Sequence, residues 1–318
     1  MISEKSLRSE SSRTKWASFI YQELNKHRFR MIFMKCIAIS LVFVAIAFNG
    51  HSTQITDTIY INSGIIQSFN GSNIPFKSYN NTLVFEKSNA ILSYSVTDTV
   101  TLTVINNDSV AHQLRCYGLG VSAGAIDPGN QVDLIISSDS PGTFIYYDQE
   151  DYPNNKILGL AGMIVFRNSS ASSFYWNLKE IDTLWVDDII NNGITSTSYN
   201  PKFFLINGNH NPDINNDPMA RVIGNVGDTI LIHIANTGNS THSVHFHGYH
   251  LEVLQSSEHS NHEGRIKDTF PINPMQALTL QMVPHQPGEY PVHDHNLVAV
   301  TGANIYPNGM FLTMLIDP

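Results

Sequence analysis

The sequence predicts an all-β protein built from two tandem β-sandwiches or small barrels. Two observations carry this prediction. The same blocks of sequence occur twice along the chain in the same order, which is the signature of a duplicated unit. Within each unit, short segments alternate β-branched and polar residues between turn-forming Asn, Asp and Gly, whereas helical periodicity is scarce.

The repeat is visible without an alignment program. Asp98-Thr99-Val100 recurs as Asp228-Thr229-Ile230, and the segment Val104–Leu119 aligns with Ile234–Tyr249. Three later blocks follow in order: Ile126-Asp127-Pro128 with Ile272-Asn273-Pro274, PGTFIYYDQ from Pro141 with PGEYPVHDH from Pro287, and Gly162-Met163-Ile164 with Gly309-Met310-Phe311. We therefore predict two homologous domains, residues 52–168 and 174–318, joined by the Ser-rich stretch Asn168–Ser173.

The strands expected in the two units have the composition of half-buried sheets. Many short strands at regular spacing favour sandwiches or small barrels. The clearest candidate for a helix, a weak one, is Asp182–Asn191. The predicted strands are Thr99–Asn106, Val132–Ser137, Thr143–Tyr147, Thr229–Asn236, Leu278–Val283 and Tyr290–His295.

Charge and cysteine content exclude several classes of protein. The 318 residues carry Lys+Arg 18 against Asp+Glu 27, a formal net charge of -9, which argues against a nucleic-acid binder because such proteins show a basic stripe. Two cysteines make neither a disulfide scaffold nor a structural zinc site. We expect no nucleic-acid partner.

The first 47 residues form an N-terminal extension with a signal peptide. The apolar run Cys36–Phe48 is shorter than the roughly 20 residues of a bilayer span, and it lies between Lys35 and the small-residue cleavage pattern Ala45-Ile46-Ala47. We expect cleavage near Ala47, export to the periplasm or medium, and no membrane association beyond the signal peptide. A short membrane anchor or a buried helix is the alternative, and whether residues 1–30 are translated is left open.

Histidines concentrate in the second unit. Of 14 in the chain, His242, His245, His247 and His250 lie close together, and His293 and His295 follow. Side chains two residues apart on a strand project from one face, so each His-x-His pair points the same way. Four imidazoles on neighbouring strands suit copper or zinc. Ordinary histidines on a solvated strand face are the alternative.

The first unit serves as an internal control for this interpretation. At the positions that match His245, His247, His293 and His295 it has Arg115, Tyr117, Tyr147 and Gln149. The fold therefore does not require imidazoles there, which favours a metal site special to the second unit. Its predicted ligands are His245, His247, His293 and His295.

The motifs THSVHFHGYHLEVL, KDTFPINP, PGEYPVHDH and NGM, together with FFLINGN at Phe203–Asn209, resemble the last cupredoxin domain of multicopper oxidases. The resemblance implies two cupredoxin-like Greek-key domains. It also implies that His245 is a type 2 copper ligand, that His247, His293 and His295 are type 3 ligands, and that His242 and Met310 belong to a type 1 site.

The chain departs from the family pattern at the type 1 site. Asp294 stands where the family has the copper-binding Cys, and Ile305 stands where it has the second His. A blue-copper site needs two His and a Cys with a weak Met ligand. For His242, Asp294 and Met310 two options stay open: an Asp–His hydrogen-bonded pair that replaces the metal, or a secondary hard-metal site.

Three functions remain open on this basis. The first is an exported copper-dependent oxidoreductase that acts on a small molecule or metal ion at the residual His site; a nitrite reductase-like enzyme is a variant of it. The second is a module for copper or zinc capture or storage, and the third is an interaction domain with a relic cluster. Oligomeric state also stays open, with a homotrimer as one option. His259 and His262 in SSEHSNHEGR are expected in a solvated loop, with metal delivery as the alternative.

Overall fold

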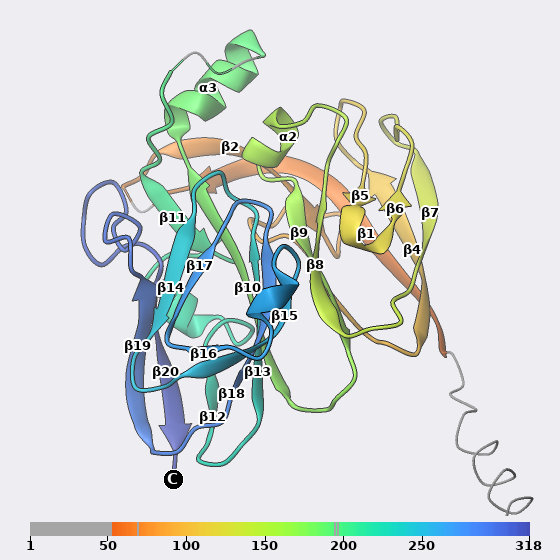
Figure 1. The fold of residues 1–318 in the computed structure, drawn as a ribbon. Coiled ribbons are helices and arrows are strands. Elements are labelled where there is room, and N and C mark those ends of the chain that lie inside the picture. Colours follow the sequence, from red (N-terminus) through yellow and green to blue (C-terminus); the bar gives the residue numbers. More distant parts are fainter. Residues whose placement is uncertain (1–52, 69, 194, 196) are drawn as a thin grey trace, which may run out of the picture. The chain divides into compact units, whose positions relative to one another are not determined.

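The computed structural model describes residues 53–68, 70–193, 195 and 197–318. The expected signal peptide and its cleavage site lie outside these residues. In the described part of the chain, no helix combines the length and apolar character needed to cross a membrane. The described chain is mostly strand, which confirms the predicted all-β class (Figure 1).

The N-terminal strands form two sheets. One has the order β2-β1-β4-β7 and the other β3-β9-β8-β5-β6. The strands are β1 Thr53–Gln67, β2 Asn73–Asn80, β3 Ile91–Ser95, β4 Asp98–Asn106, β5 Arg115–Cys116, β6 Val121–Ser122, β7 Gln131–Ile136, β8 Gly142–Tyr147 and β9 Ala161–Arg167.

The C-terminal strands form two more sheets, with the orders β11-β10-β13-β18-β15-β16 and β12-β20-β19-β14-β17. The strands are β10 Ser172–Ile181, β11 Phe203–Ile206, β12 Ile223–Asn225, β13 Ile230–Asn236, β14 His242–Phe246, β15 Leu251–Ser256, β16 Ile266–Lys267, β17 Thr269–Ile272, β18 Ala277–Met282, β19 Gly288–Asp294 and β20 Phe311–Asp317.

Strand pairing is repeated between the two halves. The long first strand of each half runs parallel to the strand that opens with the Asp-Thr motif, β1 with β4 and β10 with β13. Arg115 pairs with Tyr147 across β5 and β8, just as His245 pairs with His293 across β14 and β19. The residues that the sequence repeat matches therefore occupy equivalent cross-strand positions in the two halves.

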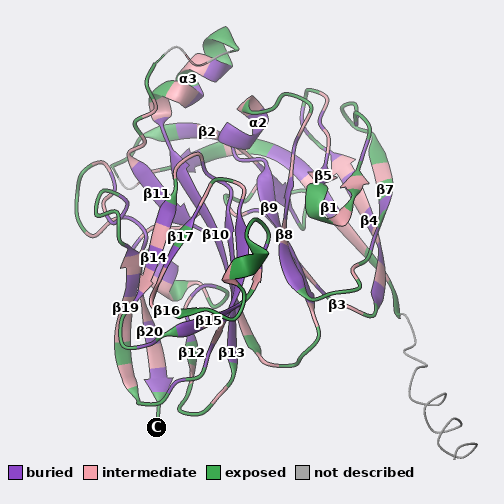
Figure 2. Cartoon of the chain, in the orientation of Figure 1, coloured by how far each residue is buried: buried purple, intermediate pink, exposed green. Residues whose placement is uncertain are grey.

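Each half has its own apolar core. One core gathers residues such as Ile59, Leu102 and Phe166, and the other gathers Trp176, Phe246 and Leu280 (Figure 2). In β4 buried and half-buried residues alternate, whereas every residue of β13 is buried. The difference arises because the first half covers the outer face of β13, where Ala235 packs in a cluster with residues of β8 and β9.

Polar contacts also join the two halves. The Thr143 hydroxyl lies 2.9 Å from that of Thr279 and 3.0 Å from Nδ1 of His233, and its amide donates to the Gln255 side chain. The side of β8 that carries Thr143, Ile145 and Tyr147 therefore faces the second half.

The predicted helix at Asp182–Asn191 is present as α3, Thr183–Asn192. Asp182 caps it by accepting hydrogen bonds from the amides of Leu184 and Trp185, which would otherwise lack partners. Gly193 ends it in the left-handed conformation. The other described helices are short: α2 Asn154–Ile157 and the 3-10 turns η1 Tyr117–Leu119, η2 Asp213–Asn216 and η3 Ser260–His262.

Candidate metal centre

Strands β14 and β19 bring the four predicted ligands together. His245 and His293 form a direct cross-strand pair, and His247 and His295 follow each of them by two residues. Phe246 and Asp294, the residues between, are buried on the opposite side of the sheet. The alternation expected from sequence therefore puts four imidazoles on one face.

The imidazole rings are in mutual contact. The ring centre of His245 lies 4.7 Å from that of His247, 5.7 Å from that of His293 and 5.5 Å from that of His295. His247 and His293 approach with their Nε2 atoms 3.1 Å apart. Two nitrogens bound to one ion at about 2 Å lie roughly 3 Å from each other, so this spacing fits a shared metal.

The backbone fixes the tautomers of two of these rings. Nδ1 of His293 donates to the carbonyl of Asp294, and Nδ1 of His245 lies 3.2 Å from the carbonyl of Asp268 and 2.8 Å from the Thr269 hydroxyl. A carbonyl accepts only, so the proton is on Nδ1 and the Nε2 lone pair is left for a metal. Metal-binding histidines are oriented in this way.

The cluster lies at the protein surface. His247 and His295 are exposed, and His245 and His293 are half-buried. Partial desolvation, together with the neighbouring imidazoles of His245 and His293, lowers the pKa of His247 below its usual value. A lower pKa favours the neutral ring that metals require. Among the described residues, no group of three or more His, Cys, Asp or Glu side chains is arranged so that it could hold a metal ion.

The matching face of the first half is built from different chemistry. Arg115 donates from Nη1 to the Gln149 side chain, and its guanidinium lies 5.5 Å from the ring centre of Tyr117. None of Arg115, Tyr117, Tyr147 and Gln149 supplies an imidazole. On this face, the four-imidazole set therefore occurs in the second half and not in the first.

His242 points to the other side of its strand and sits between two carboxylates. Its Nδ1 lies 2.6 Å from Asp294 and its Nε2 lies 3.0 Å from Glu180, and all three side chains are buried. Burial alone would lower the pKa of His242, but the hydrogen bonds to Asp294 and Glu180 raise it to about 9. The ring is therefore an imidazolium at neutral pH, with no lone pair to offer a metal.

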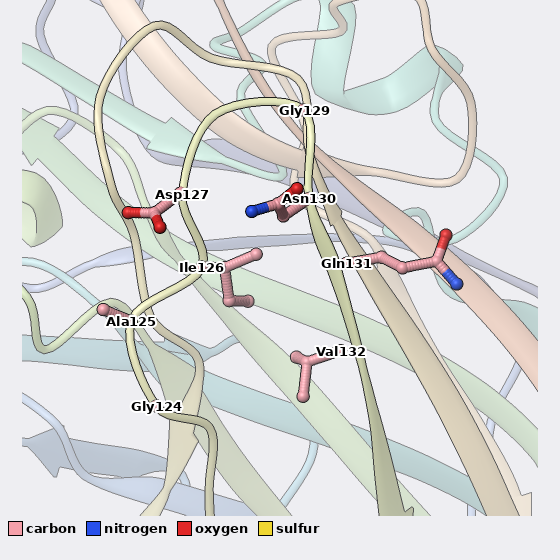
Figure 3. Close-up of a pocket in the computed structure, with 8 residues that line it drawn as sticks. All are labelled: Gly124, Ala125, Ile126, Asp127, Gly129, Asn130, Gln131 and Val132. Carbon is pink, nitrogen blue, oxygen red and sulfur yellow. The ribbon is translucent and has the colours of Figure 1, made fainter.

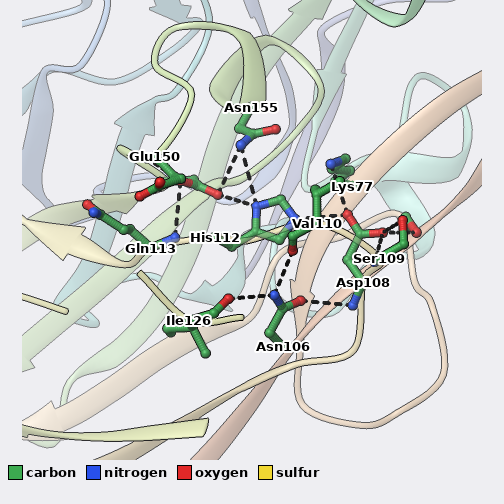
Figure 4. A network of polar contacts seen from close by, with 12 residues as sticks. Lys77, Asn106, Asp108, Ser109, Val110, His112, Gln113, Ile126, Glu150 and Asn155 are labelled. Carbon is green, nitrogen blue, oxygen red and sulfur yellow. Dashed lines mark hydrogen bonds and ion pairs between the residues drawn. The ribbon is translucent and has the colours of Figure 1, made fainter. Parts of the chain in front are cut away.

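The first half contains the same arrangement (Figure 4). His112 contacts Asp148 through Nδ1 and Asp108 through Nε2. In the second half the position that matches Asp108 is Gly238, and the Glu180 carboxylate from β10 fills the space, since a Cβ on Gly238 would lie 1.8 Å from Glu180 Oε2. The second carboxylate beside the histidine therefore comes from Asp108 in the first half and from Glu180, at a different position of the repeat, in the second.

This symmetry favours the first of the two options for Asp294. The Asp–His pair expected from the sequence is present, and both ring nitrogens of His242 already have partners. The side chain of Met310 is buried in the apolar core. A secondary metal site at His242, Asp294 and Met310 would have to displace these partners; that site stays an untested prediction.

Other sequence candidates lie away from the cluster. Cys116, the one described cysteine, is buried in the core of the first half, and burial raises the pKa of its thiol to about 12. The rings of His259 and His262 lie 4.9 Å apart and tilted at the η3 turn, with Glu258 3.6 Å from His259. Sequence reasoning missed Glu180, because a carboxylate contributed by a distant strand leaves no local motif.

A surface hollow of about 500 Å³ lies at the start of β7 (Figure 3). Its lining is small and polar, with Asp127 as the one charged side chain among the residues that form it. It contains no imidazole and gives no second location for the metal chemistry.

Comparison with known proteins supports the fold. Residues 187–318 match the multicopper oxidase family. Two solved structures of copper oxidases share the fold. A blue copper oxidase from Nitrosomonas europaea is 16% identical with a TM-score of 0.69, and the match covers 83% of this chain and 86% of that one. The multicopper oxidase mgLAC is 17% identical with a TM-score of 0.68, and the match covers 83% of this chain and 87% of that one. A copper nitrite reductase from Nitrosomonas europaea is similar at 15% and 0.64, covering 83% of this chain and 94% of that one. No curated protein matches the chain.

The chain therefore has a two-sandwich, cupredoxin-like fold, and the multicopper oxidase resemblance predicted from its motifs is confirmed over residues 187–318. The family match of residues 187–318 supports a copper oxidoreductase-like function and copper as the metal. Zinc, which the donor set alone allowed, gains no support from the comparisons.

Proposed function

We propose that this protein binds copper at His245, His247, His293 and His295 and acts as an oxidoreductase at that site without a Cys-ligated type 1 copper. One observation carries the proposal: four imidazoles from two paired strands converge on one face, with two Nε2 atoms 3.1 Å apart. Imidazole is a preferred ligand of copper.

The residues around the cluster would prepare it for a metal ion. The Asp268 and Asp294 carbonyls hold the His245 and His293 rings with Nε2 directed away from the backbone. Copper, when bound, would supply one-electron redox chemistry. The exposed His247 and His295 leave the site open to solvent, so a small molecule or metal ion can reach it directly.

The absence of a thiolate ligand shapes this proposal. The Cys position of the family is occupied by Asp294, which is hydrogen-bonded to a charged His242, and Cys116 lies in the core of the other half. Electrons would therefore enter from a substrate bound next to the four-histidine cluster. Oxygen consumption with phenolic or cuprous substrates tests this step.

The binding itself is tested by copper content after equilibrium dialysis. We expect the unaltered protein to retain about one equivalent and H247Q/H293Q to lose it, because both rings of the close nitrogen pair are removed. H259Q/H262Q is the matched control, since it removes two neighbouring histidines from a surface loop. Retention of copper by H247Q/H293Q, together with its loss from the control, would overturn the proposal.

Copper capture or storage without catalysis is the second candidate. It is favoured by the imidazolium state of His242, because that residue offers no route for electrons from a second copper. The two candidates predict the same copper content but differ in oxygen consumption. A copper-loaded protein that consumes no oxygen with any electron donor would be a capture module.

Export and self-association belong to the same proposal. Lys35 and the run Cys36–Phe48 support a signal peptide, which N-terminal sequencing of the secreted protein would test. Leu297 and Val298 follow His295 after Asn296 and are 68% and 54% exposed. An apolar edge therefore lies close to the cluster in sequence and favours packing between copies, for which we propose a homotrimer. Light scattering would measure the number of copies.

A further inference from the structure

A second hollow, of about 320 Å³, lies between the two halves on the face where the first half has lost its histidines. Tyr117 and Tyr147, which line it, occupy the positions of His247 and His293 in the repeat. Aromatic and apolar side chains from both halves make its walls. Its lining includes Tyr117, Phe144, Tyr147, Tyr152, Ser257 and Met275.

The tyrosines of this hollow are ordered against each other but open to solvent. Tyr147 and Tyr152 meet edge to face, with ring centres 5.5 Å apart. Tyr117 is 77% exposed and Tyr152 is 49% exposed, which is unusual for rings of this size. Large aromatic surfaces left open around a concavity are typical of binding sites.

Met275 forms its wall from a backbone conformation that disfavours a side chain. Its φ is +63°, and the matching residue of the first half is Gly129 at φ +77°. The two turns share the same hydrogen bonds: Met275 donates to the Asn236 carbonyl as Gly129 does to that of Asn106. Glycine adopts the left-handed region without strain and methionine does not. The second half therefore holds a strained residue whose side chain lines the hollow.

Arg115 lies beside two of the tyrosines that line the hollow and carries a positive charge. Its guanidinium lies 5.5 Å from the ring centre of Tyr117, and the residue is the direct cross-strand partner of Tyr147. Its Nη1 is held by Gln149. A guanidinium recognises carboxylates through paired hydrogen bonds and repels cations.

We propose that this hollow binds a planar, single-ring aromatic carboxylate, with the ring against the tyrosines and Met275 and the carboxylate toward Arg115. The volume is at the lower end of the range for small-molecule pockets, which suits a ligand of this size. The site is separate from the four-histidine cluster and does not depend on copper.

The experiment is calorimetric titration of the purified full chain, kept metal-free with a chelator, with 4-hydroxybenzoate and with phenol. We expect saturable binding of 4-hydroxybenzoate and weaker binding of phenol. R115Q should weaken 4-hydroxybenzoate binding about tenfold and leave phenol unchanged, because only the charge contact is removed.

M275G separates a role in binding from a role in folding. It restores the residue that the first half uses in the same turn, so the midpoint of thermal unfolding should not fall, whereas the affinity for both ligands should drop about tenfold. Y306A, which removes another exposed tyrosine outside the hollow, is the control and should change nothing.

Three results would overturn the proposal. They are a dissociation constant for 4-hydroxybenzoate weaker than about 1 mM, an equal effect of R115Q on both ligands, or tighter binding of tetramethylammonium than of 4-hydroxybenzoate.

Discussion

The two halves of this protein share a fold, a strand register and a buried polar pair, but they differ on one surface. His112–Asp148 and His242–Asp294 occupy matching positions and are both fully buried. On the other side of the same strands, the first half presents Arg and Tyr residues toward its neighbour, whereas the second half presents four imidazoles to solvent. The two halves therefore share the buried His–Asp pair but differ in the residues on the opposite face of the same strands.

This difference separates structural from functional histidines. A histidine that recurs in both halves, enclosed by carboxylates, serves the fold. A histidine that appears in one half, at the surface and beside other imidazoles, is available for chemistry. The internal repeat therefore supplies a comparison that a single sequence ordinarily lacks.

The largest expected effect comes from replacing the four clustered histidines of the second half with the residues at the matching positions of the first half. The variant H245R/H247Y/H293Y/H295Q should lose copper binding by more than a hundredfold, since every imidazole ligand is gone. Because these positions are exposed or half-buried, the free energy of unfolding should change by less than about 1 kcal/mol. Equilibrium dialysis and urea unfolding measure the two quantities, and undiminished copper binding would contradict the comparison.

The next effect concerns the buried pair. H242Q should destabilise the protein by about 3–5 kcal/mol, because it leaves the Asp294 and Glu180 carboxylates buried without their cation. H112Q should have a similar effect in the first half, where Asp108 keeps Lys77 as a second partner at 2.9 Å. Urea denaturation compares the variants; a neutral H242Q would show that the pair is not structural.

The pH dependence of stability follows from the same residue. The pKa of His242 is raised to about 9 in the folded protein, so its stabilising effect is fully present below pH 6.5 and is lost as the pH rises through 9. The size of the effect is roughly 3 kcal/mol. The difference in unfolding free energy between the unaltered protein and H242Q should therefore shrink across this window, and a constant difference would refute the assignment.

Lys179 works in the opposite direction. Burial and the neighbouring Lys156 lower its pKa to about 7, so the fold gains stability as the pH rises from 7 toward 10.5. K179M should remove this gain and stabilise the protein by about 1–3 kcal/mol near pH 7, since a buried charge is replaced by an apolar chain. Thermal unfolding at pH 7 and pH 10 measures whether K179M stabilises the protein. A K179M variant that is less stable than the unaltered protein at pH 7 would contradict the prediction.

Sequence reasoning predicted the repeat, the all-β class, α3 and the face shared by the four histidines, because each depends on local periodicity. It offered the pairing of His242 with Asp294 as one of two options, since both side chains were expected on the side of their strands opposite to the four histidines. Glu180 could not be predicted: it reaches His242 from β10 and occupies space left by Gly238. The continuous burial of β13 likewise depends on the contact between halves, which no strand pattern encodes.

The central claim is that copper in this protein is bound by imidazoles of the second half alone. X-ray absorption spectroscopy of the copper-loaded protein tests it most directly. The account predicts three or four nitrogen neighbours with the multiple-scattering pattern of imidazole and no sulfur in the coordination shell. A short copper–sulfur distance, or an unchanged spectrum in H245R/H247Y/H293Y/H295Q, would contradict it.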